Sequence, residues 1–257
     1  MTLEEDMDQL KELIPKCTAL IDQYDDVVAD GDEAEFERTF DELAEENNGV
    51  VFRLMRGYLS EMVGENRLGI YPAAGRDTEF PLNLGGRWVF VDLAYNNRQR
   101  TVTKTEKGRR VFTAKAITHS YFSDDLPPGV EPGSFDVSLI RNPFGEDPGL
   151  NRRTGCEGVV LYVSPDDPVD EEGDFFLKKR IIRGLLKHTV EPMRPGGVLL
   201  TEIDMDAFYS EEYIRPVMEP FYSQLEDGSL RLPIFEYRQR QGVKMPRIFY
   251  FVGWIKK

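Results

Sequence analysis

The sequence predicts an α/β protein with a mostly parallel sheet covered on both faces, preceded by a helical segment. Two observations favour this fold class. Residues 1–65 carry apolar side chains at three- and four-residue steps, which is typical of amphipathic helices. From Leu68 onward, short apolar runs alternate with segments of helical periodicity, which indicates strands buried on both faces. We therefore expect a helical cap over residues 1–65 and an α/β domain over residues 66–257.

The composition fits a globular protein and excludes several other classes. Of the 257 residues 40% are hydrophobic and 30% are charged, which suffices for a sizeable core. The chain is acidic, with a formal net charge of −14, which argues against general binding of nucleic-acid phosphates. No apolar run reaches the roughly 18–20 residues of a membrane-spanning helix, and the acidic start is unlike a signal peptide. We expect a cytoplasmic protein without a membrane partner. Two cysteines and two histidines predict no metal site.

The front segment predicts three helices. The first carries an apolar stripe from Leu10 to Tyr24, the second covers residues 32–47, and the third covers residues 51–62. Asn48 and Gly49 are typical of helix ends, so we expect a break between the second helix and the third. None of these helices holds an obvious reactive group. We interpret them as a scaffold or cap, with a substrate-covering lid as the alternative.

The α/β part predicts strands and helices in alternation. Residues 100–118 alternate in the manner of a hairpin about Lys107–Gly108. Helical periodicity is found in residues 175–193 and 209–228, and the chain closes with an antiparallel pair. The apolar runs that predict strands are 68–75, 87–92, 109–118, 134–141, 197–204, 232–240 and 247–257.

The ends of the first two strands are the candidate ligand site. In open α/β sheets, ligands bind beyond the carboxyl ends of the strands, where the strand order reverses. The first run ends in the small residues Pro72 to Gly75, which would let backbone N–H groups approach a ligand. The second ends in Asp92, 17 residues after Gly75, where a carboxylate can accept both ribose hydroxyls. Each signal alone also fits a tight turn or a strand cap, but together they favour a nucleoside site.

Four motifs make residues 68–257 similar to the class I S-adenosylmethionine-dependent methyltransferases. The resemblance implies a Rossmann-like, mostly parallel seven-stranded sheet with a C-terminal antiparallel strand pair. The motifs are a degenerate glycine-rich loop at Ile70–Asp77 with Gly75 as its central glycine, the acidic Asp92, the fourth-strand motif Ser134–Ile140, and the Pro-Gly-Gly turn at Met193–Leu200.

The resemblance implies an enzyme that uses S-adenosylmethionine, releases S-adenosylhomocysteine and methylates an acceptor that the sequence does not identify. Ala73 and Asp77 stand where glycines are usual in this family, and Tyr71 stands where an acidic residue is usual. These departures keep open a methyltransferase-like binding or scaffold protein. A nicotinamide-dependent oxidoreductase is the second alternative, although the first loop lacks GxGxxG. The implied cofactor-binding residues are Tyr71, Pro72, Ala73, Ala74, Gly75, Asp77, Asp92, Leu93 and Arg141.

The candidate catalytic residues are Asn142, Pro143 and Phe144. With Arg141 they resemble, in three of four positions, the Asn-Pro-Pro-aromatic motif of methyltransferases that act on amide or exocyclic amine nitrogen. In that motif the Asn accepts hydrogen bonds from the target NH2 and the aromatic ring stacks on it. A strand ended by proline and capped by Asn142 is the alternative. His119 is a candidate base or a structural histidine.

Two further segments bear on partners. Residues 98–110 hold six basic residues and one acidic residue, a local charge of +5 that fits either an RNA or acidic partner or a solvated strand pair. Residues 145–173 are expected to be an insertion that shapes the acceptor pocket. The acceptor, whether a small molecule or a protein, and the oligomeric state are not specified by the sequence.

Overall fold

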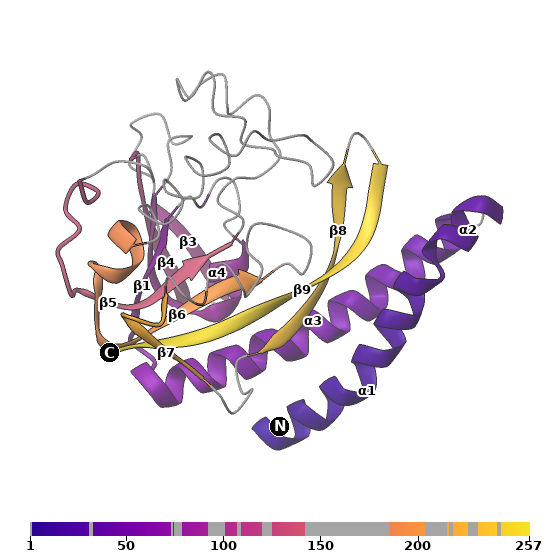
Figure 1. The fold of residues 1–257 in the computed structure, drawn as a ribbon, viewed down its shortest axis with the longest axis horizontal. Coiled ribbons are helices and arrows are strands. Elements are labelled where there is room, and N and C mark those ends of the chain that lie inside the picture. Colours follow the sequence, from indigo (N-terminus) through magenta and orange to yellow (C-terminus); the bar gives the residue numbers. More distant parts are fainter. Residues whose placement is uncertain are drawn as a thin grey trace.

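The computed structural model describes residues 2–30, 33–72, 74, 79–91, 101–106, 109–119, 125–141, 186–203, 215, 218–225, 231–240 and 243–257. Within these ranges, one mixed sheet is flanked by long N-terminal helices (Figure 1). The predicted fold class is confirmed, because the central strands are parallel and the C-terminal pair is antiparallel. None of the described helices is both long and apolar enough to cross a membrane.

The elements have the following bounds. The helices are α1 (Leu3–Asp22), α2 (Tyr24–Asp30), α3 (Glu33–Val63), α4 (Glu79–Leu84) and the short π-helix η2 (Leu186–Val190). The strands are β1 (Leu68–Pro72), β2 (Gly86–Val91), β3 (Thr101–Glu106), β4 (Arg109–Ile117), β5 (Phe135–Ile140), β6 (Met193–Ile203), β7 (Tyr222–Gln224), β8 (Leu232–Arg240) and β9 (Val243–Lys256).

The sheet has the strand order β3-β4-β2-β1-β5-β6-β9-β7, with β8 also paired to β9. Within the described residues it has nine strands rather than the expected seven, because β3 extends one edge as the predicted hairpin partner of β4 and because β7 pairs with the end of β9. The chain first runs outward from β1 through β2 to β4, then returns to β5 on the other side of β1. The strand order therefore reverses between β1 and β5.

Helix α3 is one unbroken helix, so the break predicted at Asn48–Gly49 is wrong. Its buried positions continue through that point, from Ala44 to Val51. The Asn48 amide donates to the Phe235 carbonyl at 2.7 Å and accepts from the Phe235 N–H at 3.0 Å. Because the Asn48 side chain is bound to a strand in this way, it does not compete for the helix backbone, and the helix continues.

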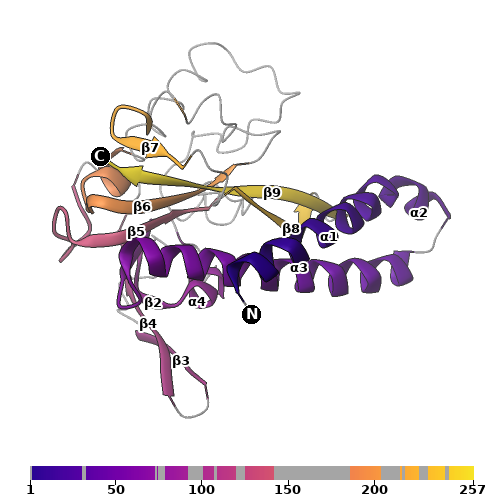
Figure 2. The same ribbon diagram turned by 90° about the horizontal axis from the view of Figure 1, so that it is seen from below.

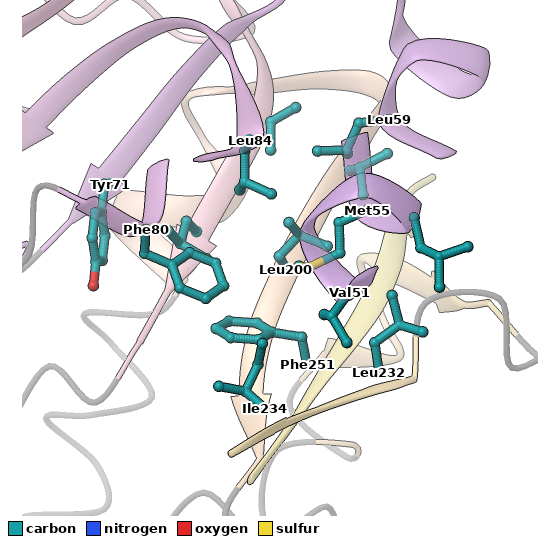
Figure 3. Packing of buried hydrophobic residues seen from close by; sticks show 14 of the residues in the cluster. Val51, Met55, Leu59, Tyr71, Phe80, Leu84, Leu200, Leu232, Ile234 and Phe251 are labelled. Atoms are coloured by element: carbon teal, nitrogen blue, oxygen red, sulfur yellow. The ribbon is translucent and has the colours of Figure 1, made fainter. Parts of the chain in front are cut away.

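The same contact marks where α3 passes the outer edge of β8. Before it, Phe36 and Phe40 cluster with Phe235 on one face of the β8–β9 hairpin. After it, the C-terminal half of α3 joins the core formed with the other face of the hairpin and with the central strands. Figure 3 shows residues of that core, with Val51, Met55 and Leu59 from α3 facing Leu200, Leu232, Ile234 and Phe251 from the sheet.

Helix α1 lies beside α3 (Figure 2) and is attached to it by a half-buried ion pair between Asp6 and Arg53. Asp6 is 4% exposed, and its carboxylate accepts from Nε of Arg53 at 2.9 Å. The N-terminus of α1 has a capping box in which Thr2 and Glu5 each accept from the other's backbone N–H. The predicted division of the chain at residue 65 stays a prediction.

Residues 222–224 correct a second expectation. The helical periodicity of residues 209–228 predicted a helix, but Tyr222–Gln224 is strand β7, paired antiparallel to the end of β9. The Tyr222 ring is buried and its hydroxyl donates to the Thr189 carbonyl at 3.0 Å. Pairing with the available edge of β9 and burial of the hydrogen-bonded Tyr222 side chain thus favour a strand here, although the local sequence pattern is helical.

Asn48→Ala is expected to destabilise the protein by about 2 kcal/mol, because it leaves the partly buried N–H and C=O of Phe235 without their side-chain partner. Urea unfolding followed by tryptophan fluorescence would measure this. Thr39→Ala, which removes an exposed hydroxyl bond in the same helix, is the control. Equal losses of stability in the two variants would contradict the role given to Asn48.

The Cys17 thiol is expected to be unreactive in the folded protein. Burial, and secondarily the charge of Glu46, raises its pKa to about 11. At pH 8 the reactive thiolate is then roughly 200-fold scarcer than for a free cysteine with a pKa near 8.5. In a Cys156→Ser background, a chromogenic disulfide reagent should therefore react at least about 100-fold faster after unfolding in urea. Rapid reaction of the native protein would show that the packing of α1 against α3 does not cover this thiol.

Candidate functional site

The carboxyl ends of β1, β2 and β5 lie at one edge of the sheet. Pro72, the last residue of β1, pairs with Val91, the last residue of β2. On its other side β1 is parallel to β5, with Ile70 paired to Ser138, so β5 ends at the same level. Since the strand order reverses between β1 and β5, this edge is the position at which open α/β sheets bind ligands.

The predicted site residues divide into a described group and an undescribed group. Tyr71, Pro72, Ala74 and Arg141 are described, and they end or directly follow β1 and β5. The segments 98–100, 107–108 and 145–173 lie outside the described residues. So do the predicted site residues Ala73, Gly75, Asp77, Asp92, Leu93, Asn142, Pro143 and Phe144.

The end of β1 is built into the core and onto β2. Tyr71 is 1% exposed, and its ring meets that of Phe90 edge-on, with the ring centroids 6.2 Å apart. Ala74 is buried, and its N–H donates to the Val91 carbonyl at 3.2 Å. This bond places Ala74 beside Val91, the last residue of β2. The Ala74 N–H is thus used within the protein, and the Tyr71 side chain belongs to the core.

Arg141 belongs to a cluster of four charged residues, which we call the charge tetrad: Arg141, Glu202, Glu236 and Arg247. Nε of Arg141 donates to Glu202 at 3.2 Å, and its Nη2 donates to Glu236. Nη2 of Arg247 donates to Glu236 at 2.6 Å and to Glu202 at 3.4 Å. Each carboxylate therefore bridges both guanidinium groups.

The tetrad is largely removed from water. The Glu202 side chain is 4% exposed, and those of Arg141 and Arg247 are 18% and 17% exposed. Both guanidinium carbons lie over the Phe249 ring, at 5.1 Å and 5.0 Å from its centroid. Charges this buried are tolerated when each has its opposite beside it, so the two carboxylates hold the guanidinium groups in place. Arg141 accordingly presents no uncompensated positive charge, and its predicted contact with a cofactor stays a prediction.

Sequence reasoning missed the other three members of the tetrad and the Phe249 ring. Glu202 is near the end of β6, while Glu236 and Arg247 are cross-strand partners in β8 and β9. No local motif marks them, because they meet only through the order of strands in the sheet. The one available signal was the spacing of charged residues within otherwise apolar runs at 198–203 and 247–255.

His119 lies two residues beyond β4, close to the other histidine of the chain. Its Nε2 donates to the Asp125 carbonyl at 2.8 Å, so this nitrogen carries the proton. Its ring is 5.6 Å from that of His188, which is fully buried. A role for His119 as a base stays a prediction. Within the described parts of the chain, no three His, Cys, Asp or Glu side chains are grouped to hold a metal ion.

Two of the four motifs behind the family resemblance lie at the opposite, amino-terminal edge of the sheet. Asp136 accepts from the Leu68 N–H at 2.6 Å and from Nε of Arg194 at 2.6 Å. Gly196 has a φ of +76°, and a Cβ on Gly197 would lie 2.9 Å from the Arg194 carbonyl oxygen. These residues lie at the starts of β1, β5 and β6, so they build the fold and do not contribute to the ligand edge.

Comparison with known proteins adds resemblances of fold at very low identity. No protein-family model matches the chain, and no curated protein matches it. Among solved structures, 1,6-didemethyltoxoflavin-N1-methyltransferase of Burkholderia thailandensis, with S-adenosylhomocysteine bound, is 12% identical with a TM-score of 0.40, covering 92% of this chain and 90% of that one. Loganic acid methyltransferase with S-adenosylhomocysteine is 8% identical with a TM-score of 0.45, covering 81% and 93%. The PH0226 protein of Pyrococcus horikoshii OT3 is 8% identical with a TM-score of 0.36, covering 82% and 92%.

Because these TM-scores are all below 0.5, we assign the fold from the order and direction of the strands in the sheet. Five parallel strands in the order β4-β2-β1-β5-β6 are closed on the β6 side by antiparallel β9. The chain therefore has the Rossmann-like fold that its resemblance to the class I S-adenosylmethionine-dependent methyltransferases implies.

Proposed function

We propose that the chain is a class I S-adenosylmethionine-dependent methyltransferase. The observation that carries this proposal is the reversal of strand order between β1 and β5. The glycine-rich loop, Asp92 and the Asn142 segment directly follow β1, β2 and β5, whose carboxyl ends share one edge of the sheet. Three sequence motifs that are far apart in the chain thus begin at the place where this fold binds ligands.

The described residues at this edge fit such a cofactor. Ala74 brings the loop after β1 onto the last residue of β2, the neighbour of Asp92, through its bond to the Val91 carbonyl. In the proposal Gly75 and its neighbours approach the methionine part of the cofactor, and Asp92 accepts the ribose hydroxyls. The cofactor supplies an activated methyl group, so the protein mainly has to align the acceptor with it.

The proposed acceptor group is an amide or amine nitrogen. The support is the Arg141-Asn142-Pro143-Phe144 segment, which begins at the carboxyl end of β5. In the proposal the Asn142 side chain accepts hydrogen bonds from the acceptor NH2, and the Phe144 ring stacks on it. This orients the nitrogen lone pair toward the methyl group without a strong base, and the proton is lost after transfer.

Asp92→Ala is expected to weaken binding of S-adenosylhomocysteine ten- to hundredfold, because a charge-assisted ribose contact contributes about 1.5–3 kcal/mol. Calorimetric titration of the purified chain with S-adenosylmethionine and S-adenosylhomocysteine would measure this. The control is Asp8→Ala, which removes an exposed carboxylate from α1. Folded wild-type protein that binds neither ligand would contradict the proposal and favour the scaffold alternative, and NADH would be the next ligand to titrate.

A further inference from the structure

The charge tetrad contains two kinds of contact. Glu236 and Arg247 are cross-strand partners, so their ion pair at 2.6 Å belongs to the β8–β9 hairpin alone. The contacts to Arg141 and Glu202 instead tie this hairpin to the carboxyl ends of β5 and β6. The tetrad therefore links the hairpin to the edge of the sheet that holds the candidate site.

Arg141 also joins the two sides of the point where the strand order reverses. It is the first residue after β5, and its guanidinium carbon lies 5.3 Å from the centroid of the Phe80 ring. Phe80 is the second residue of α4, the helix that follows the loop after β1. The Phe80 ring is itself held in the core, with its centroid 4.5 Å from that of Phe251. One guanidinium group thus contacts chain segments from both sides of the reversal.

Because the tetrad is largely buried, its structure is sensitive to any change in which positions carry positive and negative charge. Positive and negative groups alternate around the tetrad, and Glu202 is almost completely buried. Buried charges stay in place only while each has its opposite beside it. Exchanging the charges of one pair would place like charges together and push Arg141 away from its present position.

We infer that Arg141 is a positioning residue. Through the tetrad and Phe80 it sets how the carboxyl ends of β5 and β6 lie relative to α4, and the affinity for the cofactor depends on that placement. The cofactor part of this inference rests on the proposed function, whereas the placement is a property of the chain itself.

The test exchanges the charges of the hairpin pair. The double change Glu236→Arg with Arg247→Glu keeps an opposite-charge pair across the hairpin. It places a second positive charge next to Arg141 and a second negative charge next to Glu202. The matched control is Asp6→Arg with Arg53→Asp, which exchanges a half-buried ion pair between α1 and α3. Two quantities are measured on the full chain: the dissociation constant of S-adenosylhomocysteine, and hydrogen exchange of the amides in 79–84 and 140–141 without ligand.

The tetrad exchange should raise the dissociation constant at least tenfold and speed exchange in both segments at least tenfold. The control exchange should change each quantity less than twofold. If the exchanged variant does not fold, Glu236→Gln gives the same test with an expected change of about threefold, since one hydrogen-bonded charge is lost and its volume is kept.

Three results would separate the possible failures. Unchanged hydrogen exchange in a folded tetrad variant would overturn the inference. So would weakened S-adenosylhomocysteine binding by Arg141→Gln together with unaltered binding by the tetrad exchange, because Arg141 would then contact the ligand directly. If the wild-type chain binds no S-adenosylhomocysteine, the proposed function fails, and hydrogen exchange alone decides whether Arg141 positions the two segments.

Discussion

Glu202→Ala is expected to lower the free energy of unfolding by about 4 kcal/mol. Glu202 is 4% exposed and bridges Arg141 and Arg247, so its removal takes one of the two bridging carboxylates away from a pair of guanidinium groups that lie close together. Breaking a buried ion pair by removing one partner typically costs about 3–5 kcal/mol, because the remaining charge is buried without compensation. Urea unfolding followed by the fluorescence of the buried Trp88 and Trp254 would measure the loss.

The control for this prediction is Glu191→Ala. Glu191 forms an exposed ion pair with Lys187, and exposed pairs contribute at most about 1 kcal/mol. A loss of under 1 kcal/mol for Glu202→Ala would mean that water reaches the tetrad and screens its charges. In that case the difference in unfolding free energy between the wild type and Glu202→Ala should change little at high salt, since water already screens the charges of the tetrad.

Gly69→Ala is expected to cost about 3 kcal/mol, at the upper end of the range for overpacked cores. A Cβ on Gly69 would lie 2.5 Å from Cε3 of Trp88 and 2.7 Å from two further ring atoms. The Trp88 ring has little room to move, because it is 2% exposed and its Nε1 donates to the Gly85 carbonyl at 2.7 Å. The alanine must therefore displace either a buried ring or the β1–β2 pairing at Gly69 and Trp88.

A double-variant cycle with Trp88→Phe tests the cause of this cost. Trp88→Phe alone should destabilise the protein, because it removes buried ring area and the bond to Gly85. Combined with Gly69→Ala, it should cost less than the sum of the two single changes by at least about 1 kcal/mol. Additive costs would mean that Gly69 is required for a reason other than the Trp88 ring.

Local pattern was enough to predict most strands and the class of the sheet. The run at Leu68–Pro72 is apolar and ends in proline and small residues, so both the strand and its end are visible within a few positions. The β3–β4 hairpin is equally local, because alternation and the Lys107–Gly108 pair predict it. Such features need no knowledge of distant partners.

The errors come from partners that are far away in the sequence. Asn48 is a residue type typical of helix ends, but here its side-chain amide hydrogen-bonds to the backbone of Phe235, 187 residues later in the chain. Tyr222 follows a helical pattern, but its strand is created by the end of β9 and its hydroxyl bond by Thr189. In both cases a tertiary contact decides the local structure.

The candidate site was predictable only in part. Sequence motifs predict a site in the loop after β1 and the segment after β5, and the structure shows that the strands before them, β1 and β5, end at one edge. The motifs at Asp136 and Gly197 belong to the other edge. A sequence motif alone does not tell whether its residues stabilise the fold or bind a ligand. The tetrad has no motif, because its members come from three strands, β6, β8 and β9, and from the position directly after β5.

The passage of α3 across the edge of β8 also bears on how the chain folds during synthesis. Asn48 and Phe235 are separated by 187 residues, which a ribosome adds in about 10–40 s at about 5–20 residues per second. Through that interval the apolar side chains of α3 lack the β8 and β9 strands against which they pack. We expect the nascent chain to carry a formed α3 that packs on α1 but whose sheet-facing side stays uncovered until β8 and β9 are released. One of the earliest helices made is thus among the last to reach its final packing.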